Sequence, residues 1–267
     1  MHYQPLPIPP ALGGSVRAIW HLESPAAAAF TALADGCPGL LLTLSGATLS
    51  EEGGAPLPPA LLYGQTTRPI SLAAAGPFRM VVVYFYPSAL PAVFGLDAGE
   101  WTDRCLDLNL VDDRSAAVLM EQLSGATGTA GLAEALSAFL LGQARRSRYV
   151  LPGAIPYALE RIRATGGSLA LPALLRELHL TERSFQRRFK EAVGIPPKLY
   201  ARICRFQDTL HQLRRQQYAL LSDIAYEKEY ADQSHYIREF RSFAGCTPLQ
   251  YHRRLLEAVP SLPLRTS

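Results

Sequence analysis

A cluster of polar side chains lies between residues 183 and 187. Arg183, Gln186 and Arg187 are spaced i, i+3 and i+4, which places them together on one face of a helix. Phe185 and Phe189 have i, i+4 spacing on a different face, which indicates the side turned toward a core. A guanidinium suits paired hydrogen bonds to guanine O6 and N7, and a carboxamide suits adenine N6 and N7. This face could read base edges; the alternative is an ordinary solvated helix surface.

A second cluster repeats this spacing further along the chain. Ser234, Ile237 and Arg238 are again i, i+3 and i+4, with Gln233 and His235 at the start of the helix. Ile237 could contact a thymine methyl group or be buried. The candidate base-reading residues are Arg183, Gln186, Arg187, Gln233, Ser234, His235 and Arg238. Flanking cations that suit phosphate contacts are Arg188, Lys190, Lys198 and Arg241.

The two clusters belong to an internal repeat. The pattern R-x-F-x4-G-x2-P-x2-Y begins at Arg187 and again at Arg238, so every member recurs 51 residues later. The glycine suits a helix end that needs positive φ, and the proline suits the start of the next helix. A short helix precedes each copy, at Leu171–Leu178 and at Leu221–Lys228, with Thr181 and Asp232 as the expected N-caps of the helices that follow. This is the helix-turn-helix plan, whose second helix enters the major groove.

The segment between the two units predicts one connecting helix. Residues 197–216 carry the apolar stripe Leu199, Ile203, Phe206, Leu210 and Leu213. A rigid connector would present both units to one face of DNA in successive major grooves, about 10 base pairs apart.

Charge is divided unevenly along the 267 residues. Residues 1–144 hold 5 Lys and Arg against 12 Asp and Glu, whereas residues 145–267 hold 21 against 11. A basic second part favours a polyanion partner, although chance segregation of surface charge would look the same. No apolar run approaches the roughly 18 residues that span a bilayer, and the start lacks a secretion signal, so we expect a cytoplasmic protein without membrane contact.

The first part predicts a different architecture. Apolar and aromatic runs separated by Gly and Pro turns indicate strands at Val16–Leu22, Leu40–Leu44, Ala60–Tyr63, Ile70–Ala73 and Phe78–Tyr86. We expect strands to about residue 110 and helices over about 113–144. The predicted fold is α+β in two domains: a β-rich half-barrel or sandwich with helices over 1–144, a linker at 145–154, and an all-α domain with two helix-turn-helix motifs over 155–256.

Residues 155–254 resemble the DNA-binding domain of the AraC/XylS family of transcription regulators. The resemblance rests on the stretches 184–194 (SFQRRFKEAVG), Ile224-Ala225, Asp232-Gln233-Ser234 and 238–248 (REFRSFAGCTP). It implies a promoter-binding activator with RNA polymerase as partner, often a homodimer through the other domain. Two turn positions where the family often has Gly hold His179 and Glu229 here; a carboxylate at 229 would weaken DNA binding by the second unit.

The first part resembles, more loosely, the cupin-like sensor domains of one branch of that family. The matching stretches are Asp35-Gly36, 64–69 (GQTTRP) and 85–90 (FYPSAL). This implies a small-molecule effector, and aromatic residues with few polar groups suit such a pocket. The candidate pocket residues are Trp20, Gln65, Tyr84 and Tyr86.

Competing functions receive little support from the sequence. A metal-dependent cupin needs several imidazoles, but residues 1–150 contain only His2 and His21, so we expect no catalytic residues, no metal and no cofactor. The 64–67 stretch lacks the lysine of a phosphate-binding loop and suits a hairpin turn. An architectural DNA-binding protein without an effector remains an alternative.

Overall fold

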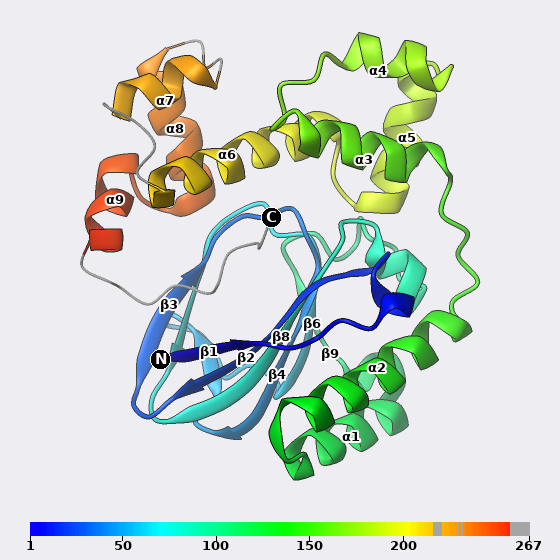
Figure 1. Ribbon diagram of the computed structural model, residues 1–267, viewed down its shortest axis with the longest axis vertical. Helices are drawn as coiled ribbons and strands as arrows, with labels where there is room; N and C mark the ends of the chain where they lie inside the picture. The colour runs from blue at the N-terminus through cyan, green and yellow to red at the C-terminus, as the bar shows by residue number, and fades with distance from the viewer. Residues whose placement is uncertain (216–220, 229, 231, 257–267) are drawn as a thin grey trace.

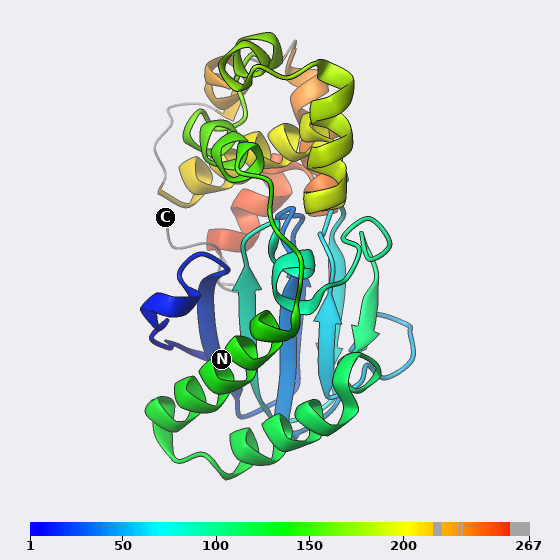
Figure 2. The same cartoon turned by 90° about the vertical axis from the view of Figure 1, so that its right-hand side faces the viewer.

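The chain folds into a β-rich part and a helical part that lie against each other (Figures 1 and 2). The computed structural model describes residues 1–215, 221–228, 230 and 232–256. Strands dominate up to Asp107, and the chain is almost entirely helical from Asn109 onward. The predicted α+β class, with a helical C-terminal domain, is therefore confirmed.

The β-rich part consists of two facing antiparallel sheets. The larger sheet has the order β1 (His2–Pro5), β2 (Val16–Ser24), β8 (Phe78–Phe85), β4 (Gly39–Gly46), β6 (Ala60–Tyr63) and β9 (Cys105–Asp107). The smaller sheet has the order β3 (Ala28–Ala32), β7 (Ile70–Ala74) and β5 (Leu49–Glu51). A 3-10 turn lies at η1 (Pro10–Leu12) and a π-helical turn at η2 (Leu90–Phe94).

The larger sheet is covered on both faces. Successive strand residues point to opposite sides, so Val81 and Val83 of β8 pack toward two helices while Met80 and Val82 face the smaller sheet. The helices are α1 (Asn109–Gly125) and α2 (Gly128–Arg146), which lie across the outer face of the sheet in Figure 2. Burial on both faces explains why β8 is nearly continuously apolar instead of alternating.

The helical part closely follows the predicted elements. Its helices are α3 (Ala154–Ala164), α4 (Leu171–Leu178), α5 (Glu182–Val193), α6 (Pro197–Arg215), α7 (Leu221–Glu227), α8 (Gln233–Ala244) and α9 (Pro248–Leu256). One hydrophobic core joins them; Phe185, Phe189, Phe206 and Phe240 are fully buried in it. The apolar stripe of α6 lies in this core, as expected for a connecting helix.

Several short elements were not predicted. Strands β1, β3, β5 and β9 have three to five residues each and carry little periodic pattern. The segment after β8 forms the five-residue turn η2. Of the four cysteines, Cys37, Cys204 and Cys246 are buried and Cys105 is exposed. Among the described residues, no helix is long and apolar enough to span a membrane, and no cluster of three or more His, Cys, Asp or Glu could hold a metal ion.

Candidate nucleic-acid interface

Helix α5 presents the first set of predicted reading residues. Thr181 caps the helix through its hydroxyl, which accepts a hydrogen bond from the Ser184 amide at 3.3 Å. At the other end Gly194 has φ +88, as predicted for a glycine that ends a helix. Arg183, Gln186 and Arg187 are exposed, opposite a buried face. The structure therefore brings these three side chains together on an accessible surface.

Two of these side chains are engaged within the helix. Arg187 forms an ion pair with Glu191 at 2.8 Å, and Gln186 donates to Glu182 at 2.9 Å. All four side chains are exposed, so these contacts are weak and easily exchanged for others. Base edges or phosphates would have to displace Glu182 and Glu191 from their partners.

Helix α8 repeats this arrangement. Asp232 caps it by accepting from the His235 amide at 2.6 Å, and Gly245 ends it with φ +73. Gln233, Ser234 and Arg238 are exposed, while His235 is half-buried. Ile237 is also half-buried and packs against the core. Packing is therefore its structural role.

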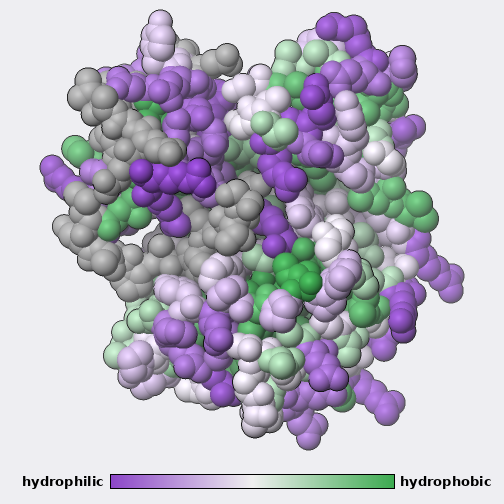
Figure 3. All heavy atoms as spheres, in the orientation of Figure 1, coloured by the Kyte–Doolittle hydropathy of each residue, from purple (hydrophilic) through white to green (hydrophobic). Residues whose placement is uncertain are grey.

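The residues assigned to phosphate contacts lie around the reading faces. Lys190, Lys198 and Arg241 are exposed and Arg188 is half-buried. In Figure 3 hydrophilic side chains gather over the two upper lobes, where α4–α5 and α7–α8 lie in Figure 1. Of the two unusual turn residues, His179 adopts the left-handed conformation at φ 50, whereas Glu229 lies outside the described residues.

A buried carboxylate that the sequence analysis missed joins α8 to α6. The Glu239 side chain is 2% exposed, and its Oε2 atom lies 2.6 Å from the Arg202 Nε atom. His235 Nε2 lies 3.9 Å from the same oxygen, and the Arg202 guanidinium stacks over the Phe243 ring at 5.5 Å. The signal was present in the sequence: positions 236, 239, 240 and 243 have i, i+3, i+4, i+7 spacing and form one buried face. Glu239 therefore fixes the second recognition helix on the connector.

The β-rich part contains a cavity of about 340 Å³ between its two sheets. Apolar side chains from both sheets form much of its wall, including Leu41, Leu61, Leu72 and Val82. Polar groups gather at one end, where Gln207 and Arg214 of α6 also contribute. The cavity therefore reaches the boundary between the β-rich and helical parts.

Of the four predicted pocket residues, the structure places Tyr84 alone in the cavity wall. Trp20 packs into the apolar cluster between the sheets. Gln65 is fully buried and donates its Nε2 hydrogen to the Pro87 carbonyl at 2.9 Å. Tyr86 lies beyond the end of β8, so strand alternation no longer directs it inward, and the Arg163 guanidinium lies 5.8 Å from its ring centre. These four residues do not form one pocket.

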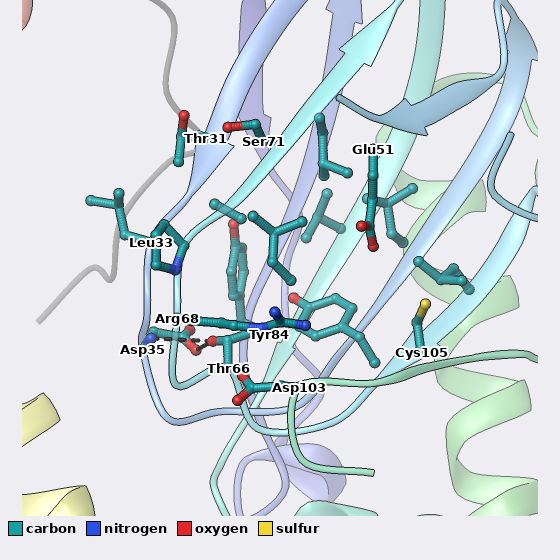
Figure 4. Close-up of a pocket in the computed structure, with 18 of the residues that line it drawn as sticks. Thr31, Leu33, Asp35, Glu51, Thr66, Arg68, Ser71, Tyr84, Asp103 and Cys105 are labelled. Atoms are coloured by element: carbon teal, nitrogen blue, oxygen red, sulfur yellow. Dashed lines mark hydrogen bonds between the residues drawn. The ribbon is translucent and has the colours of Figure 1, made fainter. Parts of the chain in front are cut away.

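A buried polar cluster occupies one end of the cavity (Figure 4). Arg17 lies 3.6 Å from Asp35, and the Thr66 hydroxyl donates to Asp35 at 2.7 Å. Burial opposes the charged form of Arg17, but Cys37 and Asp35 outweigh it and raise the pKa of its guanidinium. Burial raises the pKa of Tyr84, so its hydroxyl is neutral and available as a hydrogen-bond donor. The cavity thus combines an apolar body with a charged, hydrogen-bonding end.

Comparisons with known proteins bear on both parts. Residues 174–254 match the family model described as "Helix-turn-helix domain", and residues 2–107 match "Domain of unknown function (DUF6597)". No curated protein matches the chain significantly. The fold resembles ToxT from Vibrio cholerae at 13% identity, with a TM-score of 0.46 and coverage of 95% of this chain and 98% of ToxT.

Two further ToxT structures were determined with bound ligands. ToxT bound to (E)-4-(8-methylnaphthalen-1-yl)but-3-enoic acid is 12% identical, with a TM-score of 0.47 and coverage of 96% of this chain and 100% of that one. Wild-type ToxT bound to an unsaturated fatty acid is 13% identical, with a TM-score of 0.45 and coverage of 89% and 95%.

The family match and the two capped helices show that residues 174–254 form a helix-turn-helix domain, the class of fold whose second helix enters the major groove of DNA. The repeated motif within this domain is the part of the chain that resembles the AraC/XylS family of transcription regulators.

Proposed function

We propose that this protein is a sequence-specific transcription activator that reads two successive major grooves with α5 and α8. The observation that carries the proposal is the pair of matched recognition helices on one connector, each with a capped start and a glycine end. The base-reading and phosphate-binding roles assigned from the sequence belong to this proposal. Exposure of Arg183, Arg187 and Arg238 supports them, because major-groove contacts need accessible donors.

We further propose that the β-rich part binds a small-molecule effector between its sheets. The cavity falls in the size range of small-molecule sites, and its apolar wall with a polar end suits a ligand with an apolar body and a polar head group. Within this proposal residues 1–144 serve as sensor and dimerisation domain, 145–154 as linker and 155–256 as DNA-binding domain. RNA polymerase as partner and residence in the cytoplasm follow from the proposed activator role.

Selection of binding sites from a random DNA pool by the full chain tests the DNA-reading proposal. The expected result is a bipartite site with two conserved half-sites about 10 base pairs apart, centre to centre. Enrichment of a single half-site would contradict reading by both helices, and enrichment of no sequence would contradict specific reading altogether.

A thermal-shift screen tests the effector proposal. Small amphipathic molecules are added to the full chain and to Leu72→Trp, which fills the cavity. A ligand at 100 times its Kd should stabilise the wild type by about 2.7 kcal/mol and leave the filled variant unchanged. Equal stabilisation of both chains would place the ligand elsewhere. A screen without stabilising molecules would favour an architectural role.

A further inference from the structure

We propose that two loops of the β-rich part position the recognition helices and set the spacing of the DNA half-sites that the protein accepts. The loops span residues 33–38, between β3 and β4, and residues 64–69, between β6 and β7; we call them the mouth loops. Connector α6 is the obvious determinant of spacing, but the C-terminal ends of both recognition helices also rest on the β-rich part. The inference relies on the proposed reading of DNA by both helices.

The C-terminal end of α5 is held closely by the β-rich part. A Cβ atom added to Gly194 would lie 2.4 Å from the Ala98 carbonyl oxygen and 2.7 Å from Gln65 Oε1. Thr102 also donates a hydrogen bond from its hydroxyl to the Gly194 carbonyl at 3.3 Å. The glycine therefore provides the left-handed turn and also lets two backbones approach more closely than any other residue would allow.

Gln65 is the mouth-loop residue at this contact. Its side chain is fully buried, and the Nε2 atom is held by the Pro87 carbonyl. Its Oε1 atom has no N–H or O–H donor among the described residues and lies beside Gly194, where an added Cβ atom would be 2.7 Å away. A buried amide oxygen without a donor costs stability, so this position does not stabilise the fold. The geometry accords with a role in positioning the helix end.

The C-terminal end of α8 is held by both mouth loops. The Ala34 amide donates to the Phe243 carbonyl at 3.1 Å, and the Ala34 carbonyl accepts from Gln207 of α6 at 2.6 Å. A Cβ atom added to Gly245 would lie 3.2 Å from Pro69. The loop at 64–69 thus contacts the ends of both recognition helices, through Gln65 at one and Pro69 at the other.

The two mouth loops are tied to each other at the cavity wall. The Thr66 hydroxyl donates to Asp35 Oδ1 at 2.7 Å and accepts from the Asp35 amide at 3.2 Å, and the Gly36 amide donates to the Thr66 carbonyl at 3.0 Å. Figure 4 shows this pair at one end of the cavity, beside the labelled Asp103. Loosening the Asp35–Thr66 contact would therefore loosen the supports of α5 and α8 relative to each other.

The test measures how strictly the full chain requires one half-site spacing. The selected site is synthesised with its spacing unchanged and with one base pair inserted, and Kd is measured for the wild type, Gln65→Leu, Thr66→Val and the control Ser24→Ala. Ser24 has a buried hydroxyl with one local hydrogen bond, to the Ala26 carbonyl, at the opposite end of β2 from Arg17. One base pair shifts a half-site by about 3.4 Å and rotates it by roughly 35°.

We expect the insertion to weaken binding about 30-fold for the wild type and Ser24→Ala, comparable to the loss of one base contact. For Gln65→Leu and Thr66→Val we expect a loss of about 5-fold or less, with the original site bound nearly as well as by the wild type. A full 30-fold loss in both variants would mean that α6 alone sets the spacing and would overturn the proposal. Should Gln65→Leu fail to fold, the nearly isosteric Thr66→Val decides. A wild-type chain that selects a single half-site would refute the two-helix reading, and this inference with it, before any variant is compared.

Discussion

The buried ion pair between Arg202 and Glu239 gives a stability prediction that follows from an asymmetry in exposure. The Glu239 side chain is 2% exposed and that of Arg202 is 42% exposed. Arg202→Ala leaves a buried carboxylate without its main partner, which costs about 3–5 kcal/mol when both groups are buried. Water can enter where Arg202 stood, and His235 remains 3.9 Å away, so we expect a smaller loss in the free energy of unfolding, about 2 kcal/mol.

Two signals together distinguish the two parts of the molecule. Circular dichroism at 222 nm in a urea titration follows all helices, including α1 and α2, whereas the fluorescence of Trp20 and Trp101 follows the β-rich part alone. We expect Arg202→Ala to lower the midpoint of the helical signal, and Arg183→Ala, which removes an exposed arginine from α5, to leave it unchanged. Combining Arg202→Met with Glu239→Leu should recover most of the loss, because no unpaired charge remains.

Either of two results would contradict this prediction. A loss below about 0.5 kcal/mol for Arg202→Ala would mean that the Glu239 carboxylate reaches water without its partner. A doubly substituted chain as unstable as Arg202→Ala alone would mean that packing of the arginine stem, not the unpaired charge, carries the effect.

The remaining predictions concern DNA reading, the domain boundary and pH. Arg187→Ala should weaken binding to the selected site by about 1–3 kcal/mol and relax the base preference at one position of the site. Lys190→Ala should instead weaken binding to all sequences and lower the slope of log K against log salt concentration by about 1. Equal losses on specific and random DNA would reduce Arg187 to a phosphate contact. In urea titrations Gly194→Ala should lower the free energy of unfolding by about 3 kcal/mol and Gly245→Ala by about 1 kcal/mol. Both glycines have positive φ, but the new Cβ atom at 194 would lie 2.4 Å from a backbone carbonyl oxygen. Equal losses for the two variants would contradict the tight contact at Gly194. Burial lowers the pKa of His21 below its ordinary value of 6.5, so protonation favours the unfolded chain and the folded state loses stability as the pH falls below 6.5. His21→Gln should therefore lose less stability than the wild type between pH 7.5 and 5.5, and identical pH dependence of the two chains would contradict this.

The helical part could be predicted closely because its signals are local. Thr181 and Asp232 cap helices through their own nearby amides, and the helix-ending glycines act through their own φ angles. The aromatic spacing at 185 and 189 fixes which face is buried. Each of these effects operates within a few residues of sequence, so the repeat alone located both recognition helices and their exposed faces.

The cavity could not be predicted in the same way. Tyr84 and Tyr86 were both proposed as aromatic pocket residues. Tyr84 lies within β8 and in the cavity wall, whereas Tyr86 falls just past the end of the strand, a boundary set by pairing with β2 and β4. The polar end depends on Arg17, Asp35 and Thr66, which come from three separate segments. The sequence shows that these residues are polar or charged, but it does not show that they lie close together.

What the sequence by itself determined is therefore the helix-turn-helix domain: two repeated units, their caps, their exposed cations and the apolar connector between them. Only the tertiary structure decided that Glu239 is buried against Arg202, that Gln65 faces Gly194, and that a cavity opens near the boundary between the two parts. The physical reason is the separation along the chain over which each effect acts. Capping and periodicity arise within a few residues, whereas a buried ion pair or a close approach of two backbones exists only once distant segments have packed together.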